Sequence, residues 1–436
     1  MTRSGRAGLW HTGPDGEGAM ARWDESDRYV IITSDAHGGA ALGDYRPFLA
    51  PAWRDDFDAW LAGVVMPWFD VNDATNWDSD LRLAAMDADG VGAEIVFPNT
   101  LPPFFDILAH LSGVPRDRAA FDRKWAGLQA HNRWLVEFCR HAPLRRRGIV
   151  QLLPNDVETA VDELRWAAGT GVVAGVMLPA VPPNHVVEPY FHERYDPLWS
   201  ASVETGLPVH QHQGTGSPDV GADAPVGNSI FFTELDQWTQ RTMHHLIVGG
   251  VFERHPALQV VWTEMWGLRW VVEELAHMTL RLRNVQSRFG GDPRTLNYSR
   301  TFGSPVVDGL SLTPLEYFRR NCMIGASMLP RHEVRYCGVL GVDRIMWGTD
   351  APHPEGSAPY TTAALRATLF DVAEPDCRMM LAGNAARTYG FDLDALAPIG
   401  AAIGPLVDEV ARPLDTWPDH PGVAFQGEDP LEAVLR

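Results

Sequence analysis

Short apolar runs alternate with longer amphipathic stretches along most of the chain. Eight runs, each bounded by Gly, Pro or Asp, occupy residues 30–33, 94–97, 148–153, 175–178, 207–212, 259–264, 321–325 and 344–348. Runs of this length are typical of buried strands, and the amphipathic stretches between them, such as residues 157–168, are typical of helices. Strands that alternate with helices predict a parallel sheet built from βα units.

Eight βα units predict an α/β fold of the closed (β/α)8 TIM-barrel type, with the active site where the strands end. We assign residues 30–392 to the barrel, 1–29 to an N-terminal lead-in and 393–436 to a C-terminal extension. Two insertions, residues 44–80 and 280–314, exceed ordinary βα loops and are candidate lids over the barrel mouth. The C-terminal extension is expected to wrap the barrel or to form a subunit contact, such as that of a homodimer.

Charge and apolar length limit the partners of the chain. Its 36 Lys and Arg residues stand against 56 Asp and Glu residues, a formal charge of −20, which disfavours nucleic acid because basic side chains are needed to neutralise phosphates. Residues 1–28 contain no apolar core of signal-peptide length, and no later stretch approaches the ~18 uncharged apolar residues of a membrane span. We therefore expect a soluble, cytoplasmic protein that binds neither nucleic acid nor membranes.

Two rare residue types limit the chemistry. The four cysteines lie far apart without a CxxC spacing, which favours reduced thiols: Cys139, Cys322, Cys337 and Cys377. Lys124 is the only lysine, and its place in a polar helical stretch makes it a poor candidate for a Schiff base or a carbamylated metal bridge.

Carboxylates and histidines stand at the ends of four predicted strands. Asp35 and His37 follow the first strand, two residues apart, so their side chains point the same way. His212 ends the fifth strand, Glu264 the sixth, and Asp350 the eighth. A carboxylate at the end of an apolar strand costs several kcal/mol unless a cation or hydrogen bonds compensate. Because these strand ends meet at one mouth of the barrel, the sequence predicts a metal site there.

Each of these histidines also has a plainer interpretation. Asp35 and His37 would then form an Asx turn beside a surface histidine, and His212 would be a hydrogen-bonded histidine inside the barrel. His210 lies one layer deeper on the same strand face as His212, and for this residue we favour support of a ligand over ligation itself.

Six stretches carry a resemblance to a known family. They are Ser34-Asp-Ala-His37, Met86-Asp-Ala-Asp-Gly-Val91, Pro208-Val-His-Gln-His212, Leu246-Ile-Val-Gly-Gly-Val-Phe-Glu-Arg-His-Pro256, Trp347-Gly-Thr-Asp-Ala-Pro-His-Pro354 and Gly383-Asn-Ala-Ala-Arg-Thr-Tyr-Gly-Phe-Asp392. Through them, residues 30–392 resemble the amidohydrolase superfamily, specifically the branch of aminocarboxymuconate-semialdehyde decarboxylase and the resorcylate and carboxyvanillate decarboxylases. The resemblance implies a metal-dependent TIM-barrel enzyme.

Carried over by position, the resemblance implies that Asp35, His37, His212 and Asp350 are metal ligands, with Asp35 in the place of the first histidine of an HxH pair. Glu264 stands where the decarboxylases have a catalytic histidine, which puts ordinary decarboxylation in doubt. Two neutral imidazoles and three ionised carboxylates bring a charge of about −3, so two divalent ions with a bound hydroxide or substrate carboxylate balance it. A dinuclear centre is therefore electrostatically reasonable.

The same ligands resemble those of a group of TIM-barrel nonheme diiron monooxygenases within this fold. That resemblance, which rests on Asp35, His37, His212, Glu264 and Asp350, implies two iron ions and an external electron donor. It also implies that O2 hydroxylates a bulky apolar acid, which in many members is a CoA thioester. Because several carboxylates beside histidines are the ligands of diiron centres, we favour this interpretation.

The alternative is a mononuclear or dinuclear zinc or manganese enzyme that hydrolyses or decarboxylates a carboxylic acid. A metal-bound water would attack an acyl group, or the metal would orient a carboxylate while Asp350 transfers a proton. We assign catalysis to Glu264, Asp350 and His212, although in the oxygenase hypothesis Glu264 serves as a ligand and not as an acid–base catalyst. Three further histidines are candidates for additional ligands or for residues that support a ligand, although helix packing and loop hydrogen bonding are the plainer roles of the last two: His210, His245 and His353.

Aromatic and basic residues near the strand ends are candidates for a substrate pocket. Trp262 and Trp266 flank the end of the sixth strand, and Arg46 and Arg269 could bind a carboxylate or phosphate group. The plainer interpretation is that such tryptophans fill the core and the helix layer of a large barrel.

Overall fold

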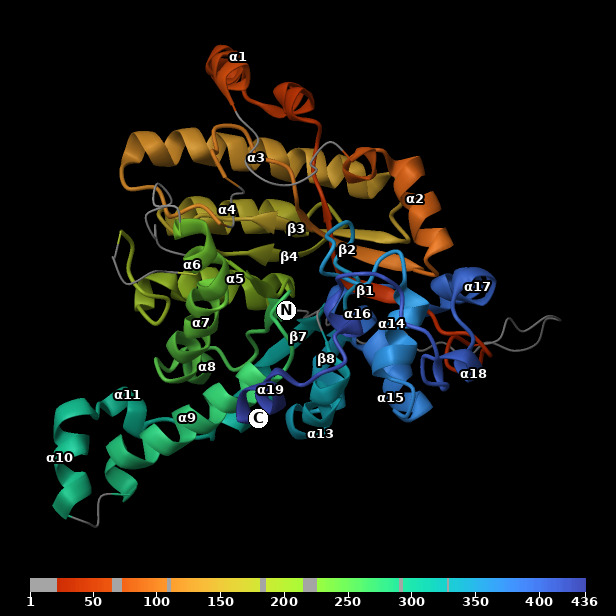
Figure 1. The fold of residues 1–436 in the computed structure, drawn as a ribbon. Coiled ribbons are helices and arrows are strands. Elements are labelled where there is room, and N and C mark those ends of the chain that lie inside the picture. The colour runs from red at the N-terminus through yellow and green to blue at the C-terminus, as the bar shows by residue number, and fades with distance from the viewer. Residues whose placement is uncertain are drawn as a thin grey trace, which may run out of the picture.

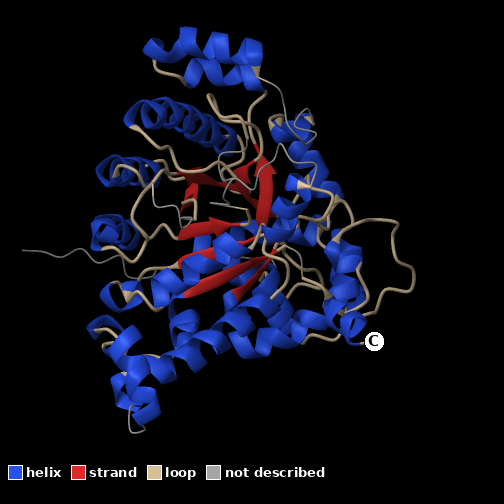
Figure 2. Ribbon diagram, turned by 60° about the vertical axis from the view of Figure 1, so that its left-hand side comes forward, coloured by secondary structure: helices blue, strands red, loops and turns tan. Residues whose placement is uncertain are grey.

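The computed structural model describes residues 22–64, 73–107, 111–180, 186–214, 226–289, 293–327 and 329–436. Eight parallel strands follow in chain order around one sheet: β1 (Ile32–Gly38), β2 (Ala93–Pro98), β3 (Arg146–Gln151), β4 (Val173–Met177), β5 (Val209–His212), β6 (Val260–Thr263), β7 (Cys322–Ala326) and β8 (Ile345–Trp347). Helices surround these strands (Figure 1, Figure 2). The predicted (β/α)8 TIM barrel is confirmed.

Helices connect successive strands and extend the chain beyond them. They are α1 (Arg54–Gly63), α2 (Ser79–Ala88), α3 (Arg118–Arg140), α4 (Val157–Ala168), α5 (Asp196–Thr205), α6 (Gly227–Glu234), α7 (Gln237–Ile247), α8 (Val251–Arg254), α9 (Arg269–Val285), α10 (Pro293–Phe302), α11 (Pro305–Asp308), α12 (Pro314–Asn321), α13 (Cys337–Leu340), α14 (Thr361–Thr368), α15 (Glu374–Arg378), α16 (Asn384–Tyr389), α17 (Leu393–Ile403), α18 (Val407–Val410) and α19 (Pro430–Leu435). An aspartate accepts a first-turn N–H of α2, α3 and α4, which defines where each helix begins. Among the described residues, no helix has the combined length and apolar character that a membrane crossing requires.

Side chains of the strands alternate between two apolar layers, as the two-residue period of a strand requires. One layer fills the inside of the barrel with residues such as Ile32, Ile95, Val261, Met323 and Met346. The other lies between the strands and the helices and includes Val96, Val150, Val260, Trp262 and Trp347. Polar residues replace the inner layer where the strands end, so the site lies on top of a packed core.

A β-bulge near the start of β1 changes which side chains face the barrel interior. Thr33 pairs with Glu94 and Ala36 with Val96, so β1 contains one residue more than β2 between these two pairs. The apolar run predicted a strand at residues 30–33, whereas β1 continues to Gly38 because its polar residues keep pairing with β2.

Hydrogen bonds between β1 and the chain just after β8 close the barrel. Ala36 and Ala351 form a parallel bridge. The His37 N–H donates to the Ala351 carbonyl at 2.7 Å, and the Asp350 N–H donates to the Asp35 carbonyl at 2.9 Å. We call this junction of residues 35–37 with residues 350–351 the seam. It places the ends of β1 and β8 side by side, although they are far apart in sequence.

The first insertion lies beside the barrel mouth. In its described part it forms α1, whose Phe57 is buried. The indole N–H of Trp60 donates to the carbonyl of Phe105, in the loop that follows β2, at 3.2 Å. Residues 65–72 of this insertion lie outside the described residues.

The second insertion lies at the opposite end of the barrel, so the prediction of a lid is wrong for this segment. It extends α9 to Val285 and adds α10 and α11. Just after α11, the Ser311 N–H donates to the Glu253 carboxylate of α8 at 2.8 Å. Since α8 leads into the N-terminal end of β6, contacts with α8 are remote from the strand ends that form the mouth.

The C-terminal extension packs back onto the barrel at two places. The Tyr29 N–H donates to the Pro405 carbonyl at 3.0 Å, and the Val407 N–H to the Asp27 carbonyl at 2.9 Å, just before β1. Farther along, Asp429 accepts a hydrogen bond from Arg269, at the start of α9, at 2.6 Å. The division into a barrel of residues 30–392 and separate end segments stays a prediction.

Candidate metal centre

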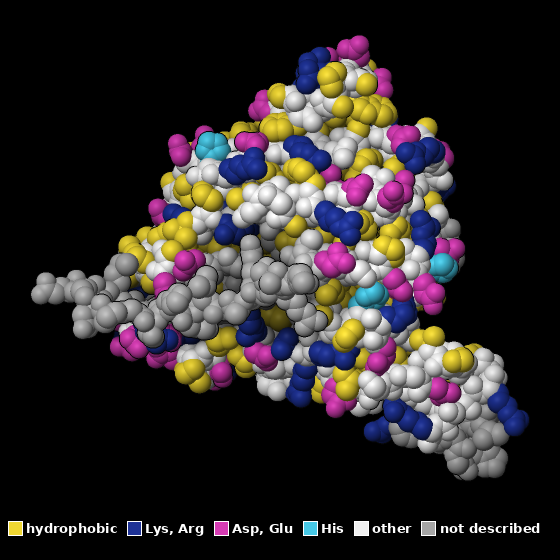
Figure 3. All heavy atoms as spheres, turned by 180° about the vertical axis from the view of Figure 1, so that it is seen from behind, with side chains coloured by type: hydrophobic (Ala, Val, Ile, Leu, Met, Phe, Trp, Pro, Cys, Tyr) yellow, Lys and Arg dark blue, Asp and Glu magenta, His cyan; other side chains and the backbone are white. Residues whose placement is uncertain are grey.

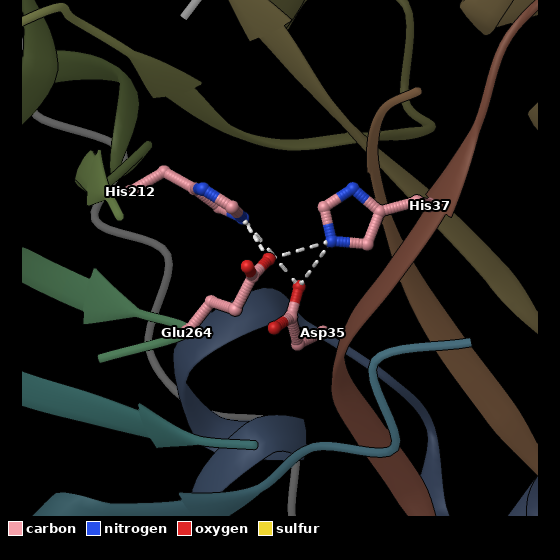
Figure 4. A group of neighbouring side chains, drawn as sticks. All are labelled: Asp35, His37, His212 and Glu264. Carbon is pink, nitrogen blue, oxygen red and sulfur yellow. Dashed lines mark hydrogen bonds and ion pairs between the residues drawn. The ribbon is translucent and has the colours of Figure 1, made fainter. Parts of the chain in front are cut away.

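Figure 4 shows four of the five predicted ligands converging at the barrel mouth. Asp35 and His37 lie in β1, His212 is the last residue of β5, and Glu264 follows β6 directly. Asp350, the fifth, follows β8. All five side chains are buried. The structure therefore brings together residues that span more than 300 positions of the chain, as the sequence predicted.

His37 occupies the centre of this group. Its Nε2 lies 3.0 Å from Glu264 Oε2, 3.2 Å from Asp350 Oδ1 and 3.3 Å from Asp35 Oδ1. His212 Nε2 lies 2.9 Å from Glu264 Oε2 and 3.9 Å from Asp35 Oδ1. His37 Nε2 thus contacts three carboxylates from three strand ends. His212 is the second imidazole of the cluster and contacts two of these carboxylates.

These ligand atoms form two overlapping groups that could each hold an ion. One consists of Asp35, His37, His212 and Glu264, and the other of His37, Glu264, Asp350 and His353; in each, the ligand atoms lie within 4.8 Å of one another. Mixed imidazole and carboxylate ligands suit zinc, manganese and iron. The residues of either group would suit a divalent ion, and His37 and Glu264 belong to both groups.

Backbone irregularities aim the carboxylates into the mouth. Glu264 has φ 59° and Asp350 has φ 58°, left-handed values that are uncommon for residues other than glycine. In β6, Val261 faces the barrel interior and Trp262 faces the helices. Because side chains alternate along a strand, a regular strand would point Glu264 toward the helices, as it does Trp262. The left-handed turn reverses this direction. Strain of this kind is typical of functional sites, where the surrounding structure holds it.

Backbone carbonyls orient both histidines. Nδ1 of His37 lies 3.2 Å from the Pro98 carbonyl, and Nδ1 of His212 lies 3.2 Å from the Gln213 carbonyl. Because a carbonyl can only accept, Nδ1 carries the proton in each ring and Nε2 faces the carboxylates. This is the usual arrangement of histidines that bind a metal through Nε2.

The carboxyl groups respond to the cluster in different ways. Burial alone would raise the pKa of Asp35 and of Glu264, but the neighbouring imidazoles outweigh it, so the pKa of Asp35 is lowered and that of Glu264 lies well below its usual value. The pKa of Asp350 is raised, first by burial and then by the charge of Glu264. Asp350 is therefore the carboxyl of the three that holds a proton most readily.

The pKa values of both imidazoles are raised, although burial alone would lower them. Burial would lower the pKa of His37, but its hydrogen bonds to Asp35, Asp350 and Glu264 raise it well above the usual value. The pKa of His212 rises to about 9, because the charge of Glu264 and the hydrogen bond to Asp35 exceed the effect of burial. Protons thus offset the carboxylate charge where no ion is bound, and a divalent cation would replace them.

One buried oxygen supports the fit of a cation. Among the described residues, Asp350 Oδ2 has no hydrogen-bond partner, and such an atom costs free energy unless something binds it. Together with the two imidazole nitrogens and the remaining carboxylates, it makes a donor set that suits a divalent ion.

The three additional histidines lie in different surroundings. His353 belongs to the cluster: its Nδ1 lies 2.9 Å from Asp350 Oδ1. His210 lies below the cluster, where its ring stacks on Tyr389 at a centroid distance of 5.7 Å. His245 lies on α7 and packs edge-on against Phe191 at 5.4 Å, outside both groups of potential ligands.

Three of the four predicted pocket residues point elsewhere. Trp262 lies between the strands and the helices, where its indole N–H donates to the Thr239 carbonyl, because of its outward register in β6. Arg46 pairs with Asp58 on the surface, and Arg269 pairs with Asp429 of the C-terminal extension. Trp266, two residues after Glu264 in the chain, is 38% exposed. Its ring contacts the Phe232 ring edge-on. It is the one of the four that stands at the rim of the mouth.

Sequence reasoning missed several residues that hold the cluster. Ser327, after β7, donates a short hydrogen bond to Asp35 Oδ2. Asn99, after β2, faces His353 Nε2 at 3.1 Å, and Gln213, after β5, donates to Glu264 Oε1 at 3.4 Å. All three directly follow a strand. Their position could have identified them, but amides and hydroxyls are so common in loops that residue type alone gives no signal.

Comparisons with known proteins give a family and a set of similar folds. Residues 77–391 match the model of the amidohydrolase family. The fold is similar to 5-carboxyvanillate decarboxylase from Sphingomonas paucimobilis, at 21% identity and TM-score 0.59 over 83% of this chain and 99% of that chain. It is also similar to an amidohydrolase from Mycobacterium avium subsp. paratuberculosis K-10, at 21% identity and TM-score 0.61 over the same shares. No curated protein sequence matches significantly.

A third similar structure contains a metal. It is 5-carboxyvanillate decarboxylase from Novosphingobium aromaticivorans DSM 12444 complexed with manganese and 4-hydroxy-3-methoxy-5-nitrobenzoic acid. It shares 18% identity at TM-score 0.61, over 84% of this chain and 97% of that chain.

These comparisons overturn the prediction of a diiron monooxygenase. The similar structures include decarboxylases of aromatic acids, and manganese is bound in several of them. The prediction of hydroxylation by O2 at two iron ions is therefore wrong, and the decarboxylase alternative fits these similar structures better. The error has a physical cause: carboxylates and imidazoles suit manganese, zinc and iron alike, so counting carboxylates cannot select redox chemistry. The electron donor and the CoA thioester, which only that resemblance implied, lose their basis with it.

Proposed function

Because the chain belongs to the amidohydrolase family, we propose that it is a metal-dependent enzyme that removes the carboxylate group of an aromatic acid. The observation that carries the proposal is the buried group of two imidazoles and three carboxylates at the C-terminal ends of the strands, where TIM-barrel enzymes have their active sites. The fold shared with manganese-containing aromatic decarboxylases supports this choice over hydrolysis.

Asp35, His37, His212, Glu264 and Asp350 are the residues that would hold the metal. A manganese or zinc ion bound there would act as a Lewis acid, orienting the substrate carboxylate and withdrawing electron density from it. With no lysine among these residues, a carbamylated bridge is not part of the site. Glu264 takes the position of the decarboxylases' catalytic histidine and is assigned here to ligation.

The reaction requires one proton at the carbon that loses its carboxylate. The bond between the ring carbon and the carboxylate carbon breaks, its electron pair stays on the ring carbon, a proton adds there, and CO2 leaves. We assign the storage of this proton to Asp350, whose Oδ1 lies 2.9 Å from His353 Nδ1 and whose Oδ2 has no hydrogen-bond partner among the described residues. Asn99 accepts from His353 Nε2 and so orients the ring that contacts Asp350.

Burial of the site favours this chemistry. His37 and Asp350 are fully buried, and His212, Glu264 and His353 are nearly so. As the carboxylate becomes neutral CO2, its localised negative charge spreads into the ring, so a site with little water favours the transition state relative to the bound acid. The Phe97 ring, 5.0 Å from the His212 ring between centroids, adds an apolar wall beside the cluster.

The experiment supplies the purified protein with Mn²⁺ or Zn²⁺ and a panel of hydroxybenzoates, and measures CO2. In D2O, each turnover should place one deuterium at the carbon that carried the carboxylate. Asp350→Asn should abolish turnover, whereas Asp58→Asn on the surface should leave it unchanged. Metal-dependent hydrolysis of amides or esters without release of CO2 would contradict the proposal.

A further inference from the structure

A buried arginine, Arg82 on α2, bridges both sides of the seam. Its Nη1 donates to the His37 carbonyl at 3.0 Å, and its Nη2 donates to the Ala351 carbonyl at 3.4 Å. Ala351 also accepts from the His37 N–H, and it directly follows Asp350. One guanidinium group therefore contacts the main chain of β1 at one ligand and the main chain after β8 next to another.

Two further buried charges hold Arg82 in place. Glu94 of β2 accepts from Arg82 Nε at 2.8 Å and, through its other oxygen, from Arg146 Nε at 2.8 Å. All three side chains are at most 3% exposed. Arg146 donates in addition to Ser79 and to the Phe138 carbonyl, and within the described part of the chain none of its hydrogen bonds reaches the seam. A buried ion triad of this kind contributes little net stability, so its value lies in the geometry that it fixes.

The seam is the place where such geometry matters. Among the described residues, Ala36–Ala351 is the one β-bridge between β1 and this part of the chain, whereas the other neighbouring strands share two or more paired residues. Asp35, His37 and Asp350 lie on its two sides. A separation of these sides by a fraction of an ångström would spread the ligand atoms that now lie within 4.8 Å.

We propose that Arg82 is a positioning residue that sets the spacing of the metal ligands across the seam, acting through the carbonyls of His37 and Ala351. The inference rests on the proposed metal site for its consequence, but the effect on the seam itself does not depend on a metal. Partners that orient ligands in this way typically change metal affinity by roughly 10–100-fold when they are removed.

The test compares Arg82→Met with Arg146→Met. Both variants remove one arginine from the same glutamate, but only the first removes the contacts to the seam. Denaturant concentrations are chosen so that both variants have equal stability. Hydrogen exchange of the metal-free proteins should then show faster exchange of the His37 and Asp350 amides in Arg82→Met alone. Arg82→Lys keeps the charge but lacks the guanidinium group that donates to both carbonyls. Its seam amides should therefore exchange as fast as those of Arg82→Met.

The second measurement is the Mn²⁺ dissociation constant, which should rise by roughly 10–100-fold more in Arg82→Met than in Arg146→Met. If the His37 and Asp350 amides exchange equally fast in Arg82→Met and Arg146→Met, Arg82 is not a positioning residue of the seam. If Arg82→Met alone shows faster seam exchange but the wild-type chain binds neither Mn²⁺ nor Zn²⁺, the role of Arg82 at the seam stands and the proposed function is wrong.

A separate observation concerns the arm, which we define as residues 280–308, the end of α9 with α10 and α11, of which the structure describes 280–289 and 293–308. It projects from the barrel in two views (Figure 1, Figure 2), and Figure 3 shows basic, hydrophobic and some acidic side chains on it. Four large apolar side chains of the arm are about half exposed or more: Leu280, Tyr298, Phe302 and Val306. Tyr298 and Phe302 share one face of α10, with ring centroids 6.1 Å apart.

The charge of the arm is opposite to that of the rest of the chain. It contains five arginines and two aspartates, which leaves 31 basic and 54 acidic residues elsewhere. A basic and apolar projection complements the acidic body of a second copy, whereas two arms placed together would repel each other. We infer that the arm docks on the body of a second copy of this chain, and that the second copy's arm docks in return.

Light scattering after size exclusion tests this docking. The wild-type chain should form a dimer that dissociates more readily at high salt, because opposite charges hold it together. Tyr298→Ser with Phe302→Ser should yield monomers, while Val339→Ser, an exposed apolar position outside the arm, should not. A dimer that high salt strengthens would indicate arm-to-arm packing and overturn the inference. So would a monomeric chain, including one whose arm binds vesicles of anionic lipid.

Discussion

His37 and Glu264, which are 227 residues apart in the chain, meet at 3.0 Å between Nε2 and Oε2 in a buried site. Glu264 also reaches His212 at 2.9 Å, so a single carboxylate oxygen contacts both imidazoles of the cluster. Glu264 is thus the residue that links β1 with β5, and its removal should affect the whole group.

Glu264→Gln is expected to weaken Mn²⁺ binding severely. The substitution keeps the shape but removes a negative charge between two imidazoles, so the dissociation constant should rise by at least the roughly 10–100-fold that is typical of residues around a ligand. Titration calorimetry with Mn²⁺ measures the change. Glu274→Gln, which breaks an outer pair with His244, is the matched control. An unchanged dissociation constant would show that Glu264 is not a ligand.

Metal binding should stabilise the folded chain. An ion that binds only the native site at 100 times its dissociation constant adds about 2.7 kcal/mol to the free energy of unfolding. Thermal unfolding with EDTA and then with Mn²⁺ should show a higher midpoint with the metal. In His212→Ala the two midpoints should nearly coincide, because the site loses one of its two central imidazoles. A similar shift in both proteins would place the metal elsewhere.

His131 should make the fold sensitive to acid. Burial lowers the pKa of this histidine to about 3, and neither ring nitrogen has a hydrogen-bond partner among the described residues. The unfolded chain binds a proton below about pH 6.5 while the folded chain does not, so stability falls as the pH decreases from about 6.5 toward 3. Between pH 7.5 and 5 this histidine should cost about 2 kcal/mol.

Urea unfolding of the wild-type chain and of His131→Gln at these two pH values isolates this effect. The variant should lose about 2 kcal/mol less than the wild type on acidification, since the two proteins share all other titrating groups. Equal losses would mean that His131 is protonated in the folded state.

Gly267 should tolerate no side chain. It lies in the turn between Glu264 and α9 at φ 74°, and an added Cβ would come within 2.1 Å of Glu333 Oε2. That carboxylate accepts the N–H groups of Leu268 and Arg269 at the start of α9. Gly267→Ala should therefore displace Glu333, destabilise the protein by more than the ~1 kcal/mol of left-handed strain, and weaken Mn²⁺ binding through Glu264.

Gly390→Ala is the control for this substitution. Gly390 has φ 75° with nothing within 4 Å of an added Cβ, so only the strain remains there. If the two variants lose equal stability in denaturant unfolding and bind Mn²⁺ equally well, the contact with Glu333 has no influence on the site.

Much of the site could be predicted because it follows from chain order. In a parallel barrel every strand ends at the same mouth, so Asp35, His37, His212 and Asp350 had to lie at that mouth once the alternating pattern was recognised. The metal and the reaction could not be predicted in this way, since the same ligands serve redox and non-redox ions.

The sequence by itself determined the barrel, its eight strands and the residues at their ends, because apolar periodicity and strand order are local properties. Only the tertiary structure decided the directions of the side chains. The bulge between Thr33 and Ala36 and the left-handed turn at Glu264 reverse the regular alternation, and so place Asp35 and Glu264 inside while Trp262 faces the helices. The contacts of Arg82 across the seam are likewise long-range, so no local pattern in the sequence encodes them.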